Sequence, residues 1–344
     1  GSSLPMIYSH NVLVIVIAAM AFSSGVCASA ANDATRDPKA VAEVLRGERE
    51  VANAVWWGFD PVNATGALQA AIRSGAATVV VPNVGKPWII DPISLESDQE
   101  IQLEAGVEIQ ARRDGFQGRS DMLFSLRDKT NVTIRGYGAV LSMRKEDYRR
   151  VPYAKSEFRM CLAIYGGTNV KILGITCANS GGDGIYIAGG RRPFSKDIVI
   201  KDVVSENNYR QGISVISVDG LLIEDSVIRG TEGTPPAAGI DFEPNKPTER
   251  LTGITLKNCV IENNQSYGIW VYTGNLEADS PPVQIAVEGG RVADNGTGAL
   301  FIQTRRSRGA LTVRSTRLEG KRSVKTSGAF TVDIDTASPA DGAR

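Results

Sequence analysis

Four stretches of this chain decide its fold: GIYI at 184–187, GISVIS at 212–217, GIDFEP at 239–244 and GIWVYT at 268–273. GALFIQ at 298–303 and GAFTVD at 328–333 continue the series, so the opening glycines recur at intervals of 28, 27, 29, 30 and 30 residues. A fixed period of this length is typical of stacked units that cannot bury their apolar faces alone. Because each unit holds β-branched runs and no helical pattern, the series predicts an all-β coiled solenoid.

The N-terminus carries the pattern of a targeting segment. Residues 12–21 (VLVIVIAAMA) form a short apolar run, and Ala28, Ser29 and Ala30 follow as an A-x-A cleavage pattern. The run is too short to span a bilayer. We therefore expect a signal peptide over residues 1–30, in which residues 1–5 are an appended sequence. Cleavage near Ala30 then gives a secreted or periplasmic protein with no membrane span.

The rest of the chain divides into three parts. Residues 31–54 are charged and predict helix, residues 55–336 carry the strands of the solenoid, and residues 337–344 form a C-terminal tail. Near the start of the solenoid, the amphipathic pattern TGALQAAIRS at 65–74 predicts a helix. A solenoid needs a cap over its first coil, because that coil otherwise exposes core and strand edges. We assign the capping role to this helix.

Composition excludes several function classes. The 38 Lys and Arg residues balance the 38 Asp and Glu residues, which argues against a general nucleic-acid binder. The single histidine, His10, lies in the leader, so the mature protein has no Ser-His-Asp triad and no His-ligated metal. The three cysteines that remain, Cys161, Cys177 and Cys259, lack metal-ligand spacing and predict small buried side chains.

Strand parity predicts which side chains face outward. The residues one and three places after each glycine are apolar in every coil from 184 to 298, so we expect them to fill the interior. The residues two and four places after each glycine then face solvent. They form a stripe of two carboxylates, three aromatic residues and a serine: Tyr186, Ser214, Asp241, Glu243, Trp270 and Tyr272. This grouping is typical of a groove that stacks sugar rings, and Leu300 and Ile302 continue it into the coil of Gly298.

Asp241 and Glu243 are the sharpest catalytic candidates in the stripe. Residues i and i+2 of one strand lie about 6.6 Å apart at the backbone and point the same way. Two close carboxylates repel each other, which raises the pKa of one of them. A pair with separated pKa values supplies one acid and one base or nucleophile.

The coil pattern resembles the right-handed parallel β-helix of the pectate-lyase-like superfamily, over roughly residues 55–335. The resemblance implies three parallel sheets and an N-terminal cap. The stretch GGDGI at 181–185 is similar to the N-T-D-G motif of family-28 polygalacturonases, which implies a catalytic role for Asp183. Two departures stand against the full family site. Arg210 and Gln211 stand where the family has adjacent aspartates, and residues 237–239 (AAG) stand where it has G-H-G.

Two arginines occupy the same place before their strands, two coils apart: Arg159 in EFRMCLAI and Arg210 in YRQGISVI. A guanidinium suits the carboxylate or sulfate groups of an acidic glycan. We expect both arginines to bind substrate, with Glu157 and Lys246 as further members of the same wall.

Three functions remain open from the sequence. The first is a glycoside hydrolase that cleaves an acidic polysaccharide with Asp241, Glu243 and Asp183 and needs no cofactor. The second is a polysaccharide lyase, in which the same three carboxylates hold Ca²⁺ and Arg210 or Lys246 abstracts a proton. The third is a non-catalytic glycan-binding β-helix. The partner in all three is a polysaccharide or oligosaccharide, and the sequence leaves the oligomeric state open.

Overall fold

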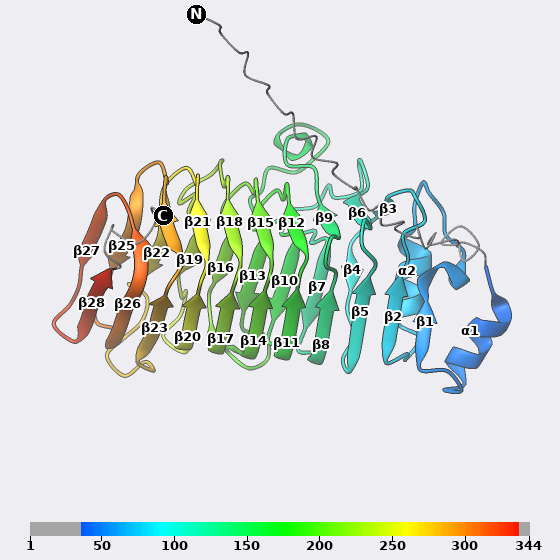
Figure 1. The fold of residues 1–344 in the computed structure, drawn as a ribbon, viewed down its shortest axis with the longest axis horizontal. Coiled ribbons are helices and arrows are strands. Elements are labelled where there is room, and N and C mark those ends of the chain that lie inside the picture. Colours follow the sequence, from blue (N-terminus) through cyan, green and yellow to red (C-terminus); the bar gives the residue numbers. More distant parts are fainter. Residues whose placement is uncertain (1–35, 337–344) are drawn as a thin grey trace, which may run out of the picture.

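The structure is a computed structural model that describes residues 36–336, and it forms one elongated solenoid (Figure 1). The paired strands of residues 36–336 are all parallel, and each turn of the chain passes through up to three sheets, which we call A, B and C. The expected parallel β-helix is therefore confirmed. The expected signal peptide at 1–30 and tail at 337–344 lie outside the described residues.

Sheet A is the longest of the three. It contains β1 (Val51–Asn53), β2 (Thr78–Val81), β5 (Gln99–Leu103), β8 (Thr130–Arg135), β11 (Thr168–Leu173), β14 (Ser195–Lys201), β17 (Val218–Glu224), β20 (Leu251–Lys257), β23 (Val283–Glu288), β26 (Gly309–Leu318) and β28 (Phe330–Thr336). Because β1 already pairs with β2, the sheet starts at Val51, before the predicted boundary at residue 55.

Sheets B and C complete each turn. Sheet B contains β3 (Trp88–Ile90), β6 (Glu108–Ala111), β9 (Val140–Ser142), β12 (Thr176–Ala178), β15 (Val204–Glu206), β18 (Val227–Arg229), β21 (Val260–Glu262) and β24 (Arg291–Ala293). Sheet C contains β4 (Ile93–Ser94), β7 (Phe124–Arg127), β10 (Leu162–Tyr165), β13 (Ile185–Ala188), β16 (Ile213–Val215), β19 (Ile240–Phe242), β22 (Tyr267–Tyr272), β25 (Gly298–Gln303) and β27 (Arg322–Lys325).

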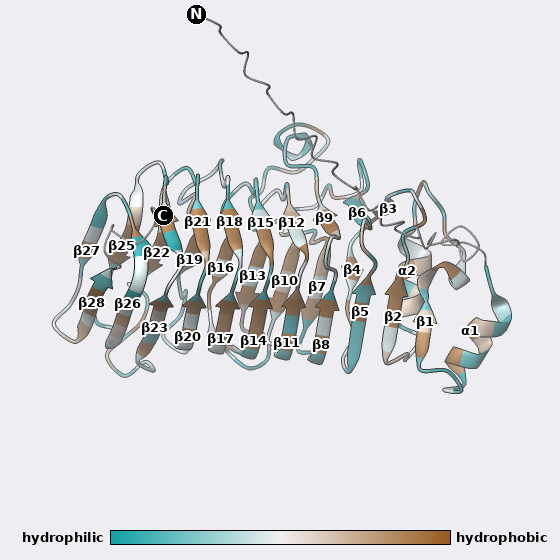
Figure 2. Cartoon of the chain, in the orientation of Figure 1, coloured by the Kyte–Doolittle hydropathy of each residue, from teal (hydrophilic) through white to brown (hydrophobic). Residues whose placement is uncertain are grey.

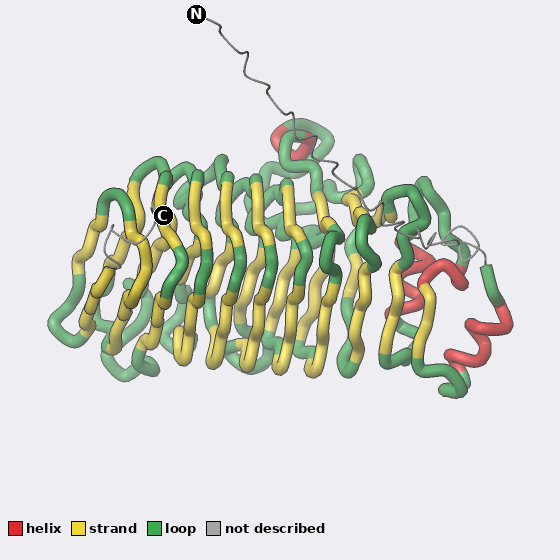
Figure 3. Tube along the Cα trace, in the orientation of Figure 1, coloured by secondary structure: helices red, strands yellow, loops and turns green. Residues whose placement is uncertain are grey.

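Helices lie mainly at the N-terminal end of the solenoid (Figure 3). Helix α1 (Pro38–Leu45) begins at Asp37, whose side chain accepts a hydrogen bond from the backbone N–H of Ala40. The 3₁₀ turn η1 (Ala54–Trp57) leads to α2 (Thr65–Ile72), the predicted capping helix. Its buried face (Ala67, Leu68, Ala71 and Ile72) joins the core of the first coils. A second 3₁₀ turn, η2 (Asp147–Arg149), lies in a long loop before β10.

Alternating parity fills the interior as expected. In β13, Ile185 and Ile187 are fully buried, and the paired positions in β16, β19 and β22 are equally buried. Hydrophobic colour therefore runs along the stacked strands in Figure 2. The opening glycines are required by packing, since a Cβ at Gly212 would lie 2.2 Å from the side chain of Ile228. One apolar core along the whole axis holds the sheets in place, and Cys161, Cys177 and Cys259 are buried in it.

The glycine series loses its register at the C-terminal end. Leu300 pairs with Ile269 and is fully buried, whereas Phe301 pairs with Trp270 and faces outward. The predicted parity of this coil was therefore wrong by one residue, because Ala299 stands in the place of the earlier glycines. Gly328 does not open a strand of sheet C either, since the strand after it, β28, pairs with β26 in sheet A.

Candidate active site on sheet C

Four members of the expected stripe follow one another along sheet C, one in each coil, on the side away from the interior. Ser214 and Asp241 are only 0% and 3% exposed, so the prediction that the whole stripe faces solvent was wrong for these two residues. Tyr186 pairs with Ser214, Ser214 with Asp241, and Asp241 with Trp270. Neighbouring coils of a parallel sheet lie about 4.8 Å apart, so these four side chains are stacked along the solenoid axis. Strand pairing in register thus brings together residues that are distant in the sequence.

Asp241 is a buried carboxyl with few partners. Its side chain is only 3% exposed, and Gln211 Nε2 donates to its Oδ2 over 3.2 Å. Its Oδ1 has no hydrogen-bond partner among the described residues, apart from the contact with Glu243 described below. Burial, together with the nearby carboxylates of Glu243 and Asp183, raises the pKa of Asp241 well above its usual range. This direction of shift favours the protonated form of Asp241, which is the form that a general acid needs.

Glu243 follows Asp241 by two residues and interacts with it. Burial also raises the pKa of Glu243, while the positive charge of Arg210 and a hydrogen bond with Asp241 lower it. Glu243 is half-buried and Asp241 is buried, so Glu243 is the member of the pair that reaches solvent. The two carboxyls thus interact electrostatically from surroundings of unequal burial.

Asp183 lies beneath the surface. It is fully buried, and Arg210 binds both of its oxygens through Nε (2.9 Å) and Nη2 (2.7 Å). The resemblance implied a catalytic role for Asp183, but the guanidinium of Arg210 covers its carboxylate in the structure.

Arg210 is surrounded by carboxylates. Besides Asp183, its Nη1 lies 3.7 Å from Glu157, and its charge also acts on Asp241 and Glu243. The neighbouring carboxylates raise its pKa further above the ordinary value. Glu157 in turn accepts a hydrogen bond from Thr234 Oγ1. Arg210 thus compensates protein charge, which leaves little capacity to bind an anionic sugar.

Arg159 was expected to bind substrate, but its side chain is buried. It is fully buried, and its guanidinium donates to the carbonyls of Phe116 (2.8 Å), Ala154 (2.6 Å) and Gln117 (3.4 Å). It lies three residues before β10, as Arg210 lies three residues before β16. The long loop at 143–158 folds over Arg159. Arg159 therefore holds this loop and is not exposed on the surface of sheet C.

The aromatic members of the stripe are half-buried. Tyr186 lies against Tyr165, with ring centroids 5.5 Å apart, and both pack on an outer apolar cluster of Met122, Met160 and Ala163. Trp270 stacks on Phe301 at 3.8 Å and 17°, so one face of the indole is covered. Tyr272 is half-buried on the same strand. Lys246 is exposed in the turn after β19 and makes no ion pair with any residue that the structure describes.

Sequence reasoning missed three groups of residues. Gln211 connects the coils by donating to Asp241 and accepting from Ala238 N–H, but a lone glutamine carries no sequence signal. Phe301 was missed because the glycine-based alignment of its coil was shifted by one residue. The third group is the loop at 143–158, where the basic and aromatic run MRKEDYRRVPYAK at 143–155 was the available signal.

The three carboxylates do not match the calcium site that a lyase would need. Both oxygens of Asp183 are bonded to Arg210, and Asp241 is buried with Gln211 donating to its Oδ2. Within residues 36–336, no three His, Cys, Asp or Glu side chains are grouped in a way that would hold a metal ion. None of the helices described there is long and apolar enough to cross a membrane.

Comparisons with known proteins agree with this architecture. Residues 155–318 match the family model for a right handed beta helix region. The chain is a right-handed parallel β-helix. An endo-polygalacturonase of Sclerotinia sclerotiorum is 26% identical over 171 residues, which cover 45% of this chain and 40% of the fungal protein. The chain thus spans well under half of the curated relative that it matches.

Solved structures show the same fold at low sequence identity. PfbA, a surface adhesin of Streptococcus pneumoniae, has a TM-score of 0.60 at 12% identity. The match covers 83% of this chain and 80% of the PfbA chain. A galactohydrolase whose name contains galactose-4-sulfate and 3,6-anhydro-galactose-2-sulfate has a TM-score of 0.58 at 15% identity. The match covers 76% of this chain and 70% of the galactohydrolase chain. A tailspike capsular polysaccharide depolymerase of the Acinetobacter baumannii phage Fri1 has a TM-score of 0.52 at 12% identity, covering 83% and 58%.

Proposed function

We propose that this protein is a glycoside hydrolase that cleaves a polysaccharide bound along sheet C. The observation that carries the proposal is the pair of interacting carboxyls, Asp241 and Glu243, at the end of β19 beside Arg210 and Trp270. The curated relative is a polysaccharide hydrolase by name, which supports the same class. Titratable groups whose environments separate their pKa values are typical of acid–base sites.

The two carboxyls take different roles because their surroundings differ. Asp241 is the proton donor to the glycosidic oxygen, since burial keeps it protonated. Glu243 is the base that activates water, since the charge of Arg210 favours its ionised form. An inverting reaction requires about 6.5–9.5 Å between the carboxyls to hold that water. The side chain of Glu243 must therefore move away from Asp241 when the sugar enters, and its partial exposure allows this.

Asp183 and Arg210 act as positioning residues in this proposal. The bidentate bond fixes the guanidinium plane, and the guanidinium then sets the charge felt by Glu243. Tyr186 and Trp270 flank the pair and supply apolar surface for sugar rings. An acidic substrate remains a prediction, because the two arginines that suggested it are occupied by protein groups.

The test is turnover of a panel of neutral, uronic and sulfated polysaccharides by the intact chain. Reducing ends and ultraviolet absorbance are recorded together, with Asp241→Asn as the inactive variant and Asp279→Asn as the exposed control. Reducing ends without absorbance, lost only in Asp241→Asn, are expected. Absorbance would indicate a lyase, and silence across the panel would favour a glycan-binding protein.

We also propose that the protein is exported, on the leader pattern at residues 12–30. Expression of the whole chain with mass spectrometry of the product tests this. A mature N-terminus near Ala31 is expected, and retention of residues 1–30 would contradict export.

A further inference from the structure

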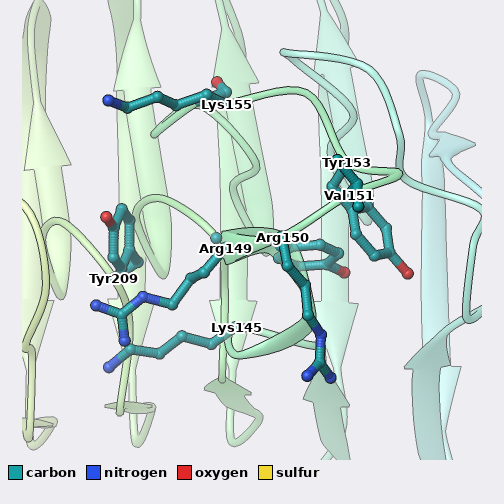
Figure 4. Close-up of a pocket in the computed structure, with 10 residues that line it drawn as sticks. Lys145, Arg149, Arg150, Val151, Tyr153, Lys155 and Tyr209 are labelled. Carbon is teal, nitrogen blue, oxygen red and sulfur yellow. The ribbon is translucent and has the colours of Figure 1, made fainter.

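A cavity of about 590 Å³ lies beside the carboxyl site, under the loop at 143–158 (Figure 4). Its volume lies within the range of small-molecule sites. Ten residues line it: Lys145, Tyr148, Arg149, Arg150, Val151, Tyr153, Lys155, Ser156, Gly181 and Tyr209. The loop projects beyond the solenoid in Figure 1, so this cavity is formed by an insertion and not by the repeating coils.

The lining is cationic. Four of its residues are Lys or Arg, and none is Asp or Glu. Lys145 is only 5% exposed, and its Nζ bonds to a neutral group, Asn207 Oδ1, at 3.1 Å. Lys155 is exposed and has no ion pair within residues 36–336. Arg149 lies 3.3 Å from Glu146 in an ion pair of exposed side chains, and the charges of Glu146 and Glu232 also act on Lys145. Neither carboxylate lines the cavity, so an anion entering it would meet the cations directly and be stabilised there.

Aromatic rings supply the remaining surface. Tyr148, Tyr153 and Tyr209 line the cavity, and the guanidinium of Arg149 lies 5.3 Å from the ring centroid of Tyr209. Figure 4 shows Lys145, Arg149 and Lys155 directed toward the coil that carries Tyr209, while Arg150 points away. Behind the rings, the buried Nη1 of Arg159 has no partner among the described residues. A sugar ring with an anionic substituent matches this combination of rings and cations.

Two chain segments connect the lining of the cavity with the carboxyl site. Tyr209 lines the cavity, and the next residue, Arg210, binds Asp183. On the loop side, Lys155 and Ser156 line the cavity, and the next residue, Glu157, lies 3.7 Å from Arg210. Gly181 and Tyr209 belong to the coils just before that of Asp241, at a spacing of about 4.8 Å per coil. One glycan could therefore reach both sites.

We propose that this cavity binds the anionic group, carboxylate or sulfate, of a sugar unit in the glycan that lies along sheet C. The inference rests on the proposed function, because it assigns the substrate class of the same groove. In this proposal Lys145, Arg149 and Lys155 recognise the acidic substrate, in place of Arg159 and Arg210.

The test is calorimetric binding to the intact chain. The probes are an oligogalacturonate, a sulfated galacto-oligosaccharide and a neutral galacto-oligosaccharide of equal length. The variant is Arg149→Gln/Lys155→Gln, which removes two exposed cations. The control is Lys171→Gln/Lys196→Gln, which removes two exposed cations from sheet A in the neighbouring coils. The melting temperature of each variant checks that it is folded.

At least one anionic probe is expected to bind more tightly than the neutral one, and which one binds tells carboxylate from sulfate. Arg149→Gln/Lys155→Gln should raise its Kd about tenfold or more, and the control should leave it unchanged. Equal Kd values in the wild type and Arg149→Gln/Lys155→Gln would overturn the inference, as would equal affinity for the neutral probe or no binding of either anionic probe.

The same probes separate this inference from the proposed function. If the hydrolase proposal fails and the cavity proposal holds, no polysaccharide is cleaved but the charge-dependent Kd values remain. If the cavity proposal fails and the hydrolase proposal holds, cleavage is lost in Asp241→Asn while Arg149→Gln/Lys155→Gln binds as the wild type does.

Discussion

Arg210 binds both carboxylate oxygens of Asp183 across neighbouring coils, at 2.9 Å and 2.7 Å. Asp183 is fully buried and the side chain of Arg210 is 13% exposed, so the pair is largely withdrawn from water. Removing one member of such a pair leaves an uncompensated buried charge. Substitutions at Asp183 and Arg210 therefore measure how strongly this ion pair stabilises the site.

We expect Arg210→Met to lower the free energy of unfolding by about 3–5 kcal/mol, because the carboxylate of Asp183 loses its cation. Arg210→Met/Asp183→Asn should recover part of this loss, since no charge is then left unpaired. Urea denaturation of the wild type, both single variants and the double variant measures the coupling. Strictly additive losses would mean that the pair is not energetically coupled.

Asp241→Asn should stabilise the folded protein in a pH-dependent way. The folded-state pKa of Asp241 is raised above its unfolded value, so the wild type binds the proton more tightly when folded. Its stabilising contribution is fully present below the unfolded pKa of about 3.9 and is lost as the pH rises through the folded pKa. Asparagine does not ionise, so the free energy of unfolding of Asp241→Asn should exceed that of the wild type by an amount that grows with pH.

The measurement is the free energy of unfolding of the wild type and Asp241→Asn between pH 4 and pH 8. The difference should grow by about 1.4 kcal/mol for each pKa unit of the shift that lies in this window. Asp279→Asn, at an exposed position, is the control. A difference that does not depend on pH would show that Asp241 is ionised in the folded state.

Arg159→Met should release the loop at 143–158 without unfolding the solenoid. The guanidinium joins the carbonyl of Ala154 in this loop to those of Phe116 and Gln117. Hydrogen–deuterium exchange should then rise at 143–158 and stay unchanged in β13 and β16. Arg159→Lys should not restore protection, because an ammonium lacks the planar fork that reaches all three carbonyls. Unchanged exchange at 143–158 would show that Arg159 does not hold the loop.

The fold could be predicted from the sequence because a solenoid is determined by short sequence patterns that repeat along the chain. The glycine period, the β-branched runs and the strand parity each repeat in every coil, so errors in one coil do not spoil the rest. The stripe of Tyr186, Asp241 and Trp270 followed directly from that parity. The failure at Phe301 has the same origin, since Ala299 replaced the glycine on which the alignment was built.

Side-chain contacts between coils could not be predicted in the same way. Asp183 and Arg210 are 27 residues apart, and their bond depends on the rotamers of both side chains. Arg159 and Arg210 hold equivalent places, yet Arg159 bonds to backbone carbonyls, whereas Arg210 bonds to Asp183 and lies over the ring of Phe158. Such a loop interrupts the repeat, so the repeat pattern predicts its length and composition but not its backbone conformation.

The proposed acid–base chemistry depends most directly on the raised pKa of Asp241 and on its coupling to Glu243. Titration of their side-chain carboxyl carbons by NMR in the intact chain, assigned with Asp241→Asn and Glu243→Gln, measures both. We predict that Asp241 titrates well above the ordinary value of about 3.9 and that Asp241→Asn changes the titration of Glu243. Independent titration of both carboxyls at ordinary values would contradict the central claim.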